Sequence, residues 1–279
     1  SEIGESIIKS VRLAINKINN SSIEIIPKDT KSNPDTTLEA ARELASSEVK
    51  IIIGPVFNEN LVYLDRLGEI TFLALTNKNN NFSKNIINAG INAVSQLNAI
   101  NKFIQLNKIE KTIFLTPDLD FKNEIEEAIS ISKIKIIENY IYDTNPTKLT
   151  KQIEKITHYK ARKQNLEDEI VRLEKLDQSN KELLIERLKK KDTLGSVSFD
   201  SVVISDFDES LKSVTTSLLY TDVSPKEKYF ITLNQWFDDS LLKETSSQPL
   251  YFPSANKKNY DEFSSEYYEK YNQYPNQLS

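Results

Sequence analysis

Residues 49–55 read Val-Lys-Ile-Ile-Ile-Gly-Pro, and this run indicates the class of the fold. A short, nearly unbroken apolar run is typical of a strand that is buried on both faces, and the Gly-Pro pair ends it. A second strand of the same kind is predicted from Ile70 to Leu75. Because buried strands of this type belong to parallel sheets, we expect an α/β fold.

Strand and helix patterns alternate outward from this run along the chain. Further strands are predicted through Ile136 and at 23–27, 111–115, 201–204, 229–232 and 250–252. Helices are predicted around Leu61 and Leu64, from Asp35 and Pro146, over an aromatic stripe from Tyr260 to Tyr271, and at 5–19, 93–106, 120–133, 209–220 and 238–244. Strands that alternate with helices form βαβ units, so the sequence predicts two doubly wound, Rossmann-like lobes.

One densely charged segment, residues 160–192, interrupts this alternation. Ser179 and Glu182 form a capping box that would begin a second helix, and Gly195 supplies a stop. The pattern predicts an antiparallel helical hairpin inserted into the second lobe. It is either a solvated hairpin that packs on its own lobe or a surface that binds a partner.

The composition excludes several classes of function. The 279 residues carry a net charge of −5, no Cys and a single His, His158. An acidic chain lacks the basic face that nucleic acid requires, and thiolate chemistry is absent, so neither a nucleic-acid partner nor a metal site is expected. The sequence has no apolar run long enough to span a membrane, and residues 1–20 are amphipathic rather than patterned like a signal peptide. It also has no glycine-rich phosphate loop and no Gly-x-Ser-x-Gly elbow, so we expect no cofactor.

Acidic residues follow two of the predicted strands, where open α/β sheets place their ligands. The pairs are Asp118 with Asp120 and Asp206 with Asp208. They could serve as the acid and nucleophile of a glycosidase-like enzyme, or as loop and helix-capping residues. We expect the second role, and therefore a protein that has no catalytic residues and is not an enzyme.

Aromatic residues also fall just beyond predicted strands. They are Phe57, Phe121, Phe207 and Trp236. Each could simply pack in the core or at its rim. Together they could line a cleft between two lobes, with loop amides and helix N-termini as hydrogen-bond donors for a small molecule or a peptide end.

Several motifs resemble a known family. They are Asp29-Thr30, Pro34 with Ala40 and Ala41, Ile52-Ile53-Gly54-Pro55, Leu75-Thr76-Asn77, and the Phe-x3-Tyr-x3-Tyr-x3-Pro pattern from Phe263 to Pro275. This set resembles the type 1 periplasmic binding proteins of the Leu/Ile/Val-binding kind. The resemblance implies that residues 1–108 and 248–279 form the first lobe and residues 109–247 the second, with the hairpin at 160–192. It also implies that the first strand lies before Ser1 and that the final helices lie after Ser279.

The resemblance implies a ligand site in the cleft between the lobes. Its expected residues are Pro55, Val56, Phe57, Asn58, Thr76, Asn77, Asp118, Phe121, Asp206, Asn234 and Trp236. The amino-acid binders of the family have a Ser-rich turn after Gly-Pro, whereas this chain has Val56-Phe57-Asn58, and Pro117 to Phe121 contains no Gly where the family has a Gly-rich turn. Thr76 keeps the family pattern. The missing donors argue against tight capture of a free amino acid, whose two charges need partners.

The hairpin, Asp192-Thr-Leu-Gly195 and Phe199-Asp200 further resemble the branch of penicillin-binding-protein activators, which are outer-membrane lipoproteins. This implies a non-catalytic periplasmic activator or scaffold for a peptidoglycan synthase, attached to the outer membrane by a lipid anchor upstream of Ser1. The alternative is an extracellular receptor of an ABC importer that closes its lobes around an amino acid or another small polar solute.

Overall fold

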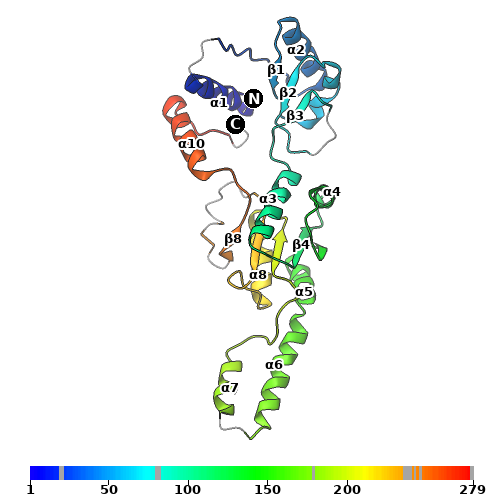
Figure 1. Cartoon of the computed structure of the whole chain (residues 1–279), viewed down its shortest axis with the longest axis vertical. Coiled ribbons are helices and arrows are strands. Elements are labelled where there is room, and N and C mark those ends of the chain that lie inside the picture. Colours follow the sequence, from blue (N-terminus) through cyan, green and yellow to red (C-terminus); the bar gives the residue numbers. More distant parts are fainter. Residues whose placement is uncertain are drawn as a thin grey trace. The chain divides into compact units, whose positions relative to one another are not determined.

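Figure 1 shows the computed structural model, which describes residues 1–18, 22–78, 83–177, 180–234, 241, 243–244 and 247–276. The chain divides into unit 1, Ser1–Ser95 with Ser254–Ser279, and unit 2, Gln96–Pro253. The division at 253/254 differs from the predicted boundary at 247/248, because strand β8 (Leu250–Tyr251) pairs with β7 (Tyr229–Thr232) of the second unit. The division at 95/96 differs from the predicted boundary at 108/109, because Phe103 packs on Tyr229 and Tyr251 of these strands. The assignment of the lobes stays a prediction.

Unit 1 contains a small parallel sheet in the order β1-β2-β3. Its strands are β1 (Ile51–Ile53), β2 (Thr71–Ala74) and β3 (Ile86–Asn88). Helix α2 (Pro34–Ser46) and the 3-10 helices η1 (Asn58–Leu61) and η2 (Leu64–Arg66) pack against one face of it. The Asn33 side chain caps α2 by accepting hydrogen bonds from the amides of Asp35 and Thr36 at 3.0 and 3.1 Å.

The core of unit 1 lies between this sheet and α2. The residues that point to that face include Phe72, Ala74, Ile86, Leu38 and Leu64. On the opposite face the register aligns Ile53 with Leu73 and Leu73 with Ile87, and the Ile53 and Ile87 side chains are 46% and 51% exposed. The strands therefore carry apolar residues on both faces, but β1 is not buried on both, because Ile51 and Ile53 are exposed. The prediction of a strand buried on both faces was wrong for β1, although its pairing is parallel as predicted.

Helices α1 (Glu2–Ile18) and α10 (Lys257–Tyr271) of unit 1 pack on each other. The buried Tyr267 hydroxyl is hydrogen bonded to the Ser6 hydroxyl at 3.2 Å, and the Tyr271 hydroxyl donates to the Lys9 carbonyl at 3.1 Å. The predicted aromatic stripe thus serves packing, with its phenol groups bonded to α1.

Unit 2 contains a five-stranded, fully parallel sheet in the order β5-β4-β6-β7-β8. Its first three strands in chain order are β4 (Thr112–Pro117), β5 (Glu138–Tyr142) and β6 (Ser201–Ile204). Every residue of β4 and β6 is buried, as expected for central strands covered on both faces.

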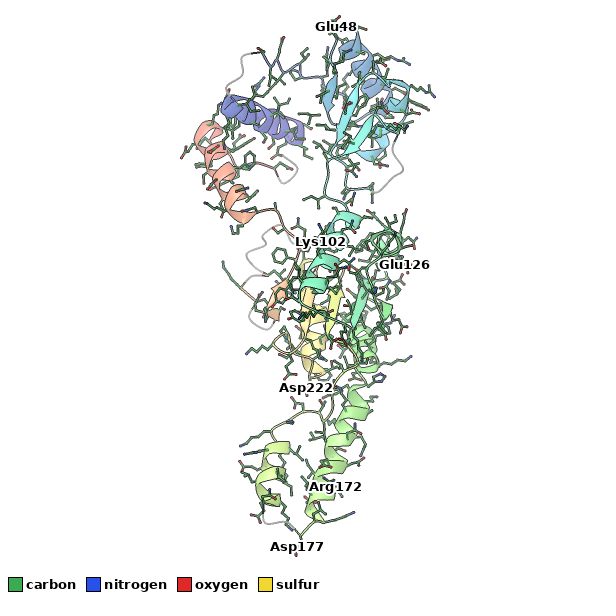
Figure 2. All side chains as sticks on the ribbon, in the orientation of Figure 1. Glu48, Lys102, Glu126, Arg172, Asp177 and Asp222 are labelled. Carbon is green, nitrogen blue, oxygen red and sulfur yellow. The ribbon has the colours of Figure 1, made fainter. Side chains whose placement is uncertain are left out.

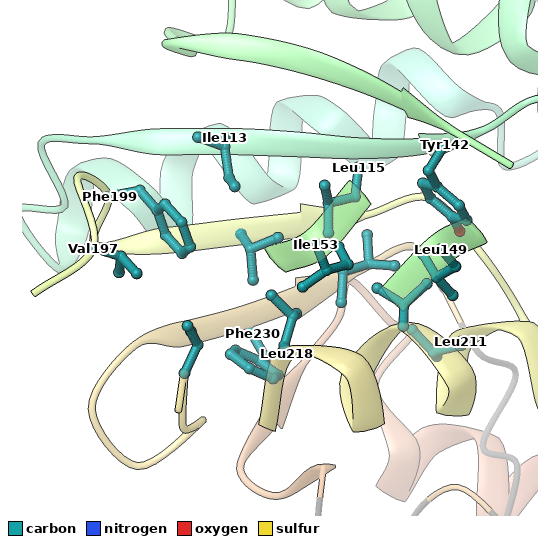
Figure 3. Packing of buried hydrophobic residues seen from close by; sticks show 14 of the residues in the cluster. Ile113, Leu115, Tyr142, Leu149, Ile153, Val197, Phe199, Leu211, Leu218 and Phe230 are labelled. Carbon is teal, nitrogen blue, oxygen red and sulfur yellow. The ribbon is translucent and has the colours of Figure 1, made fainter. Parts of the chain in front are cut away.

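Two layers of helices cover this sheet. Helices α5 (Pro146–Ile156) and α8 (Asp208–Tyr220) supply Leu149, Ile153, Leu211 and Leu218 to the core on one face (Figure 3). On the other side, Phe103 of α3 (Ala93–Leu106) packs its ring 4.9 Å from that of Tyr251. Helix α4 (Lys122–Ser132) contacts β4.

Two further helices of unit 2 extend beyond the end of α5 (Figure 1). They are α6 (Tyr159–Glu174) and α7 (Lys181–Leu188), which lie against each other. Leu166 and Leu173 of α6 are buried, whereas no residue of α7 is. Figure 2 shows Arg172 on α6 and Asp177 in the segment between the two helices. Ser179, the residue expected to cap the second helix, lies outside the described residues.

Several predicted elements differ in the structure. The strand predicted at 23–27 is not formed, because no strand of the described part of the chain pairs with it, and Ile23 and Ile26 are 44% and 41% exposed. Strand β3 was not predicted, since its only apolar residues, Ile86 and Ile87, stand between Asn85 and Asn88 in a polar stretch. Strand β5 lies at 138–142 instead of passing through Ile136. The predicted helix at 238–244 falls mostly outside the described residues.

Candidate functional site

The first group of candidate residues follows β1 in unit 1. Gly54 has φ +118°, a conformation that favours glycine, and the chain turns there into Pro55. The Gly54 amide donates to the Leu73 carbonyl at 2.9 Å, and the Leu75 amide donates to the Pro55 carbonyl at 3.0 Å. These bonds bring the loop after β1 beside the loop after β2, so Pro55 lies next to the segment that carries Thr76.

Thr76 is buried at 3% exposure, and its hydroxyl oxygen accepts a hydrogen bond from the Lys78 amide at 3.1 Å. Gly90 approaches the same residue so closely that a Cβ atom there would lie 2.1 Å from the Thr76 carbonyl oxygen. The side chain of Thr76 is therefore bonded within its own loop, and its backbone lies against Gly90. Asn77, the next candidate, is exposed.

The other candidates of unit 1 differ in how open they are. The Phe57 side chain is 45% exposed, whereas Val56 and Asn58 are half-buried. An exposed phenylalanine in the loop after a parallel strand can contact the apolar part of a ligand.

The second group of candidates lies in unit 2, at the carboxyl edge of its sheet. Asp118 and Phe121 follow β4 and line a hollow of about 490 Å³ with Leu119, Asp120, Lys122 and Asn123. Lys122 pairs with the Asp118 carboxylate at 2.5 Å. The Phe121 ring meets the Phe207 ring at 6.4 Å in an edge-to-face arrangement. Two of the predicted aromatic residues therefore lie together at the ends of β4 and β6.

Asp206 follows β6 but does not face solvent, since it is only 4% exposed. One carboxylate oxygen accepts a hydrogen bond from the Tyr142 hydroxyl, and the other accepts from the Phe207 amide at 2.9 Å. Tyr142 is the last residue of β5 and is 1% exposed. Asp206 therefore joins strand ends beneath the loop surface.

Burial shapes the ionisation of this pair. It raises the pKa of the Asp206 carboxyl above its ordinary value, although the hydrogen bonds from Tyr142 and the Phe207 amide act in the opposite direction. Burial, and then the negative charge of Asp206, raise the pKa of the Tyr142 phenol far above its usual range. In this pair the Tyr142 hydroxyl donates and the Asp206 carboxyl oxygen accepts.

Asn234 follows β7 and is 6% exposed. Its amide donates to the Gln96 side-chain oxygen at 2.8 Å, which ties the strand end to α3. Trp236, the last candidate, lies outside the described residues. Of the candidates in unit 2, Asp118 and Phe121 therefore line an accessible hollow, whereas Asp206 and Asn234 are buried.

A sequence model of the family described as periplasmic binding protein matches residues 1–161, which is more than half of the chain. The chain belongs to the periplasmic binding protein family. The family match confirms the resemblance noted in the motifs at the level of the family. A search of curated protein sequences finds no match.

Solved structures similar to this periplasmic binding protein support the same fold. A putative branched-chain amino acid ABC transporter protein from Rhodospirillum rubrum has a TM-score of 0.69 at 10% identity, over 99% of this chain and 75% of the other. A branched-chain amino acid ABC transporter periplasmic ligand-binding protein from Burkholderia xenovorans has a TM-score of 0.60 at 11% identity, over 99% and 70%. An ABC transporter substrate-binding protein from Desulfitobacterium hafniense, in complex with Leu, has a TM-score of 0.55 at 12% identity, over 97% and 74%. At these identities the similarity shows the fold alone, and it confirms the predicted α/β fold with parallel sheets.

Two residues of this periplasmic binding protein were missed by sequence reasoning. Tyr142 was missed because β5 was placed too early, so the end of this strand was not searched. Gln96 carries no signal in the sequence, because its role depends on where α3 meets β7.

Among the described residues, no helix is long and apolar enough to cross a membrane, and no three His, Asp or Glu side chains are grouped to hold a metal ion.

Proposed function

We propose that this periplasmic binding protein is a non-catalytic solute receptor of an ABC importer. The observation that carries the proposal is the membership of the family, joined to aromatic residues after strands of both units, the exposed Phe57 and the half-buried Phe121. The solved structures with similar folds are transporter binding proteins, and one of them is in complex with Leu. Family membership indicates a periplasmic or extracellular location.

The proposed ligand is a small polar solute that has an apolar part. In unit 2 the Phe121 ring would contact the apolar part, and the Lys122–Asp118 pair beside it offers both a cation and a carboxylate. In unit 1 the Phe57 ring would offer an aromatic contact of its own. Thr76 and Asn77 would supply donors from the loop after β2. Asp206 and Asn234 would position the loops, because both are buried and bonded within the protein.

A thermal-shift screen of the purified protein against amino acids, short peptides and muropeptides tests the proposal. A ligand that binds only the folded state raises the melting temperature by mass action. We expect one ligand class to do so, and we expect Phe57→Ala and Phe121→Ala to reduce the shift. Leu106→Ala is the matched control, because Leu106 is 83% exposed on α3 and lies outside the candidate loops. Absence of a shift with every ligand would contradict the solute-receptor function.

A second candidate function is that of an activator or scaffold for peptidoglycan synthases. In this function the protein itself would be attached to the outer membrane by a lipid anchor. Two observations favour it: Val56 stands where the amino-acid binders of the family have a Ser-rich turn, and α6 and α7 lie almost wholly outside the residues that match the family model. Two results together would favour this function over solute capture. The protein would bind a purified synthase without any added muropeptide, and no ligand in the thermal-shift screen would raise its melting temperature.

A further inference from the structure

We propose that residues 159–191, the helical arm formed by α6 and α7, are a docking surface for a protein partner that presents acidic side chains around an apolar contact. This inference does not depend on solute binding by the loops at the strand ends. Three features of the arm carry it: a fixed base, a positive charge on an acidic protein, and exposed aliphatic side chains.

The base of the arm is fixed by one buried cation. Arg162, in the first turn of α6, is only 5% exposed. Its guanidinium donates to the Thr157 carbonyl at 2.9 Å, to the Thr193 hydroxyl at 3.0 Å and to the Thr221 carbonyl. These acceptors lie after α5, after the arm and after α8, so a single planar group joins three segments of unit 2.

Further contacts complete this base. The Thr193 hydroxyl donates to the Asp222 carboxylate at 2.5 Å, and the rings of Tyr159 and Tyr220 lie 5.5 Å apart. The base of the arm is therefore held in place by the protein's own contacts. A surface that is already ordered loses less conformational entropy on association than a flexible one does.

The charge of the arm is opposite to that of the remaining chain. Residues 159–191 contain ten Lys or Arg and seven Asp or Glu, which gives a net charge of +3. The rest of the chain contains 26 Lys or Arg and 34 Asp or Glu, which gives a net charge of −8. Arg172 pairs with Glu169, and Lys190 pairs with Glu186. Lys189 and Lys191 are exposed, and in the described part of the chain neither forms an ion pair. A partner with acidic side chains would complement this end of the arm and would be attracted over some distance.

Two aliphatic side chains favour a protein partner over a polyanion. Val171 and Leu183 are 46% and 52% exposed on α6 and α7. The successive acidic residues Glu167, Asp168 and Glu169 of α6 would repel a uniformly negative polymer such as a nucleic acid, so the acidic side chains of the partner would face Lys189 and Lys191 instead. An interface with apolar side chains and charges of both signs has the composition of a protein–protein contact.

Photo-crosslinking in cells that naturally produce the full chain tests the inference. A photo-reactive amino acid is placed at Leu183, and at Leu106 as the control, because both leucines are exposed on helices of unit 2. The protein captured at Leu183 is identified and purified. Its affinity is then measured for the wild type, for Lys189→Glu/Lys191→Glu, and for Lys151→Glu/Lys155→Glu, which makes the same charge change at exposed positions of α5.

We expect an adduct at Leu183 and none of the same mass at Leu106. The variant of Lys189 and Lys191 should weaken the affinity about tenfold, the α5 variant should leave it within about twofold, and high salt should weaken the wild-type complex. Capture without this charge dependence would overturn the inference, as would the same adduct at both leucines, no adduct at Leu183, or an adduct with a nucleic acid or a second copy of the chain. Equal melting temperatures of the three proteins exclude misfolding as the cause, and solute binding should be the same in all three.

Discussion

A hydrogen bond from the hydroxyl of Tyr142 to the carboxylate of Asp206 passes over the end of β4, a strand that contains neither residue. Tyr142 ends β5 and Asp206 follows β6, whereas β4 lies between these two strands in the sheet. The Asp118 amide, just after β4, also donates to the Tyr142 carbonyl at 2.8 Å. The buried pair therefore supports the loop that carries Asp118 and Phe121, on the side of the loop that faces the sheet.

Replacing Tyr142 with Phe should destabilise unit 2. The substitution removes the phenol donor and leaves the buried Asp206 carboxylate with the Phe207 amide. Loss of a hydrogen bond to a buried charged group costs about 1.5–3 kcal/mol. Urea unfolding measures the effect, and Tyr220→Phe is the control, because Tyr220 is 55% exposed. Equal losses in both variants would show that the bond to Asp206 contributes nothing.

The Asp206 carboxyl should give the stability of the protein a distinctive dependence on pH. Burial raises its pKa in the folded state above the ordinary value of 3.8, so the folded protein holds this proton more tightly than the unfolded chain does. The contribution of Asp206 to the free energy of unfolding should therefore fall as the pH rises from about 3.8 through the raised pKa. Asp206→Asn removes the titrating group, so the difference in stability between variant and wild type should change with pH in this window and be constant above it. A difference that is constant from pH 3 to pH 8 would contradict the raised pKa.

Substitution of Arg162 by Lys should loosen the base of the helical arm. A lysine has no planar fork to reach the three acceptors at once, and the burial that lowers the pKa of the Arg162 guanidinium would act on the ammonium group as well. We expect a loss of about 2–3 kcal/mol in the free energy of unfolding. Hydrogen exchange should also increase in α6 and α7. Arg172→Lys on the exposed surface of α6 is the control, and a similar response to both changes would argue against the anchoring role.

Gly90→Ala should disturb Thr76 directly. The added Cβ would lie 2.1 Å from the Thr76 carbonyl oxygen, so the backbone of the loop after β2 must move. We expect a loss of about 1–3 kcal/mol in stability and weaker binding of whichever solute the thermal-shift screen identifies. Gly68→Ala is the matched control, because no atom lies within 4 Å of the Cβ it would add. Unchanged ligand affinity in the Gly90 variant would remove Thr76 from the ligand site.

Long apolar patterns made most of the fold predictable from the sequence. Strands β6 and β7 and helix α3 lie at the predicted residues. A continuous apolar run indicates a buried strand and apolar residues at helical spacing indicate an amphipathic helix, and both patterns can be recognised in the sequence alone. Short or partner-dependent elements were not predictable. Strand β3 has three residues in a polar stretch, and the run from Ile23 to Pro27 has strand composition but lacks a strand to pair with among the described residues.

The candidate site was predictable only as a set of loops. The rule that ligands lie beyond the carboxyl ends of parallel strands selected Phe57, Phe121 and Asp206. It could not show that Asp206 turns inward to Tyr142, because the direction of a side chain after a strand depends on which neighbouring strand end offers a partner. The sequence position of Asp206 is the same for an exposed and for a buried carboxylate.

The amide of Leu194 donates to the carbonyl of Arg162 at 3.0 Å, so the chain enters and leaves the helical arm at almost the same point of unit 2. The entropy of closing such a loop grows only with the logarithm of its length, and each doubling costs about 0.6 kcal/mol. The segment between these residues is thus a module that can be lengthened, shortened or exchanged for a tight turn while the sheet beneath keeps its register. A change in the proposed docking surface would therefore leave the strand ends of unit 2, with their proposed ligand residues, unchanged.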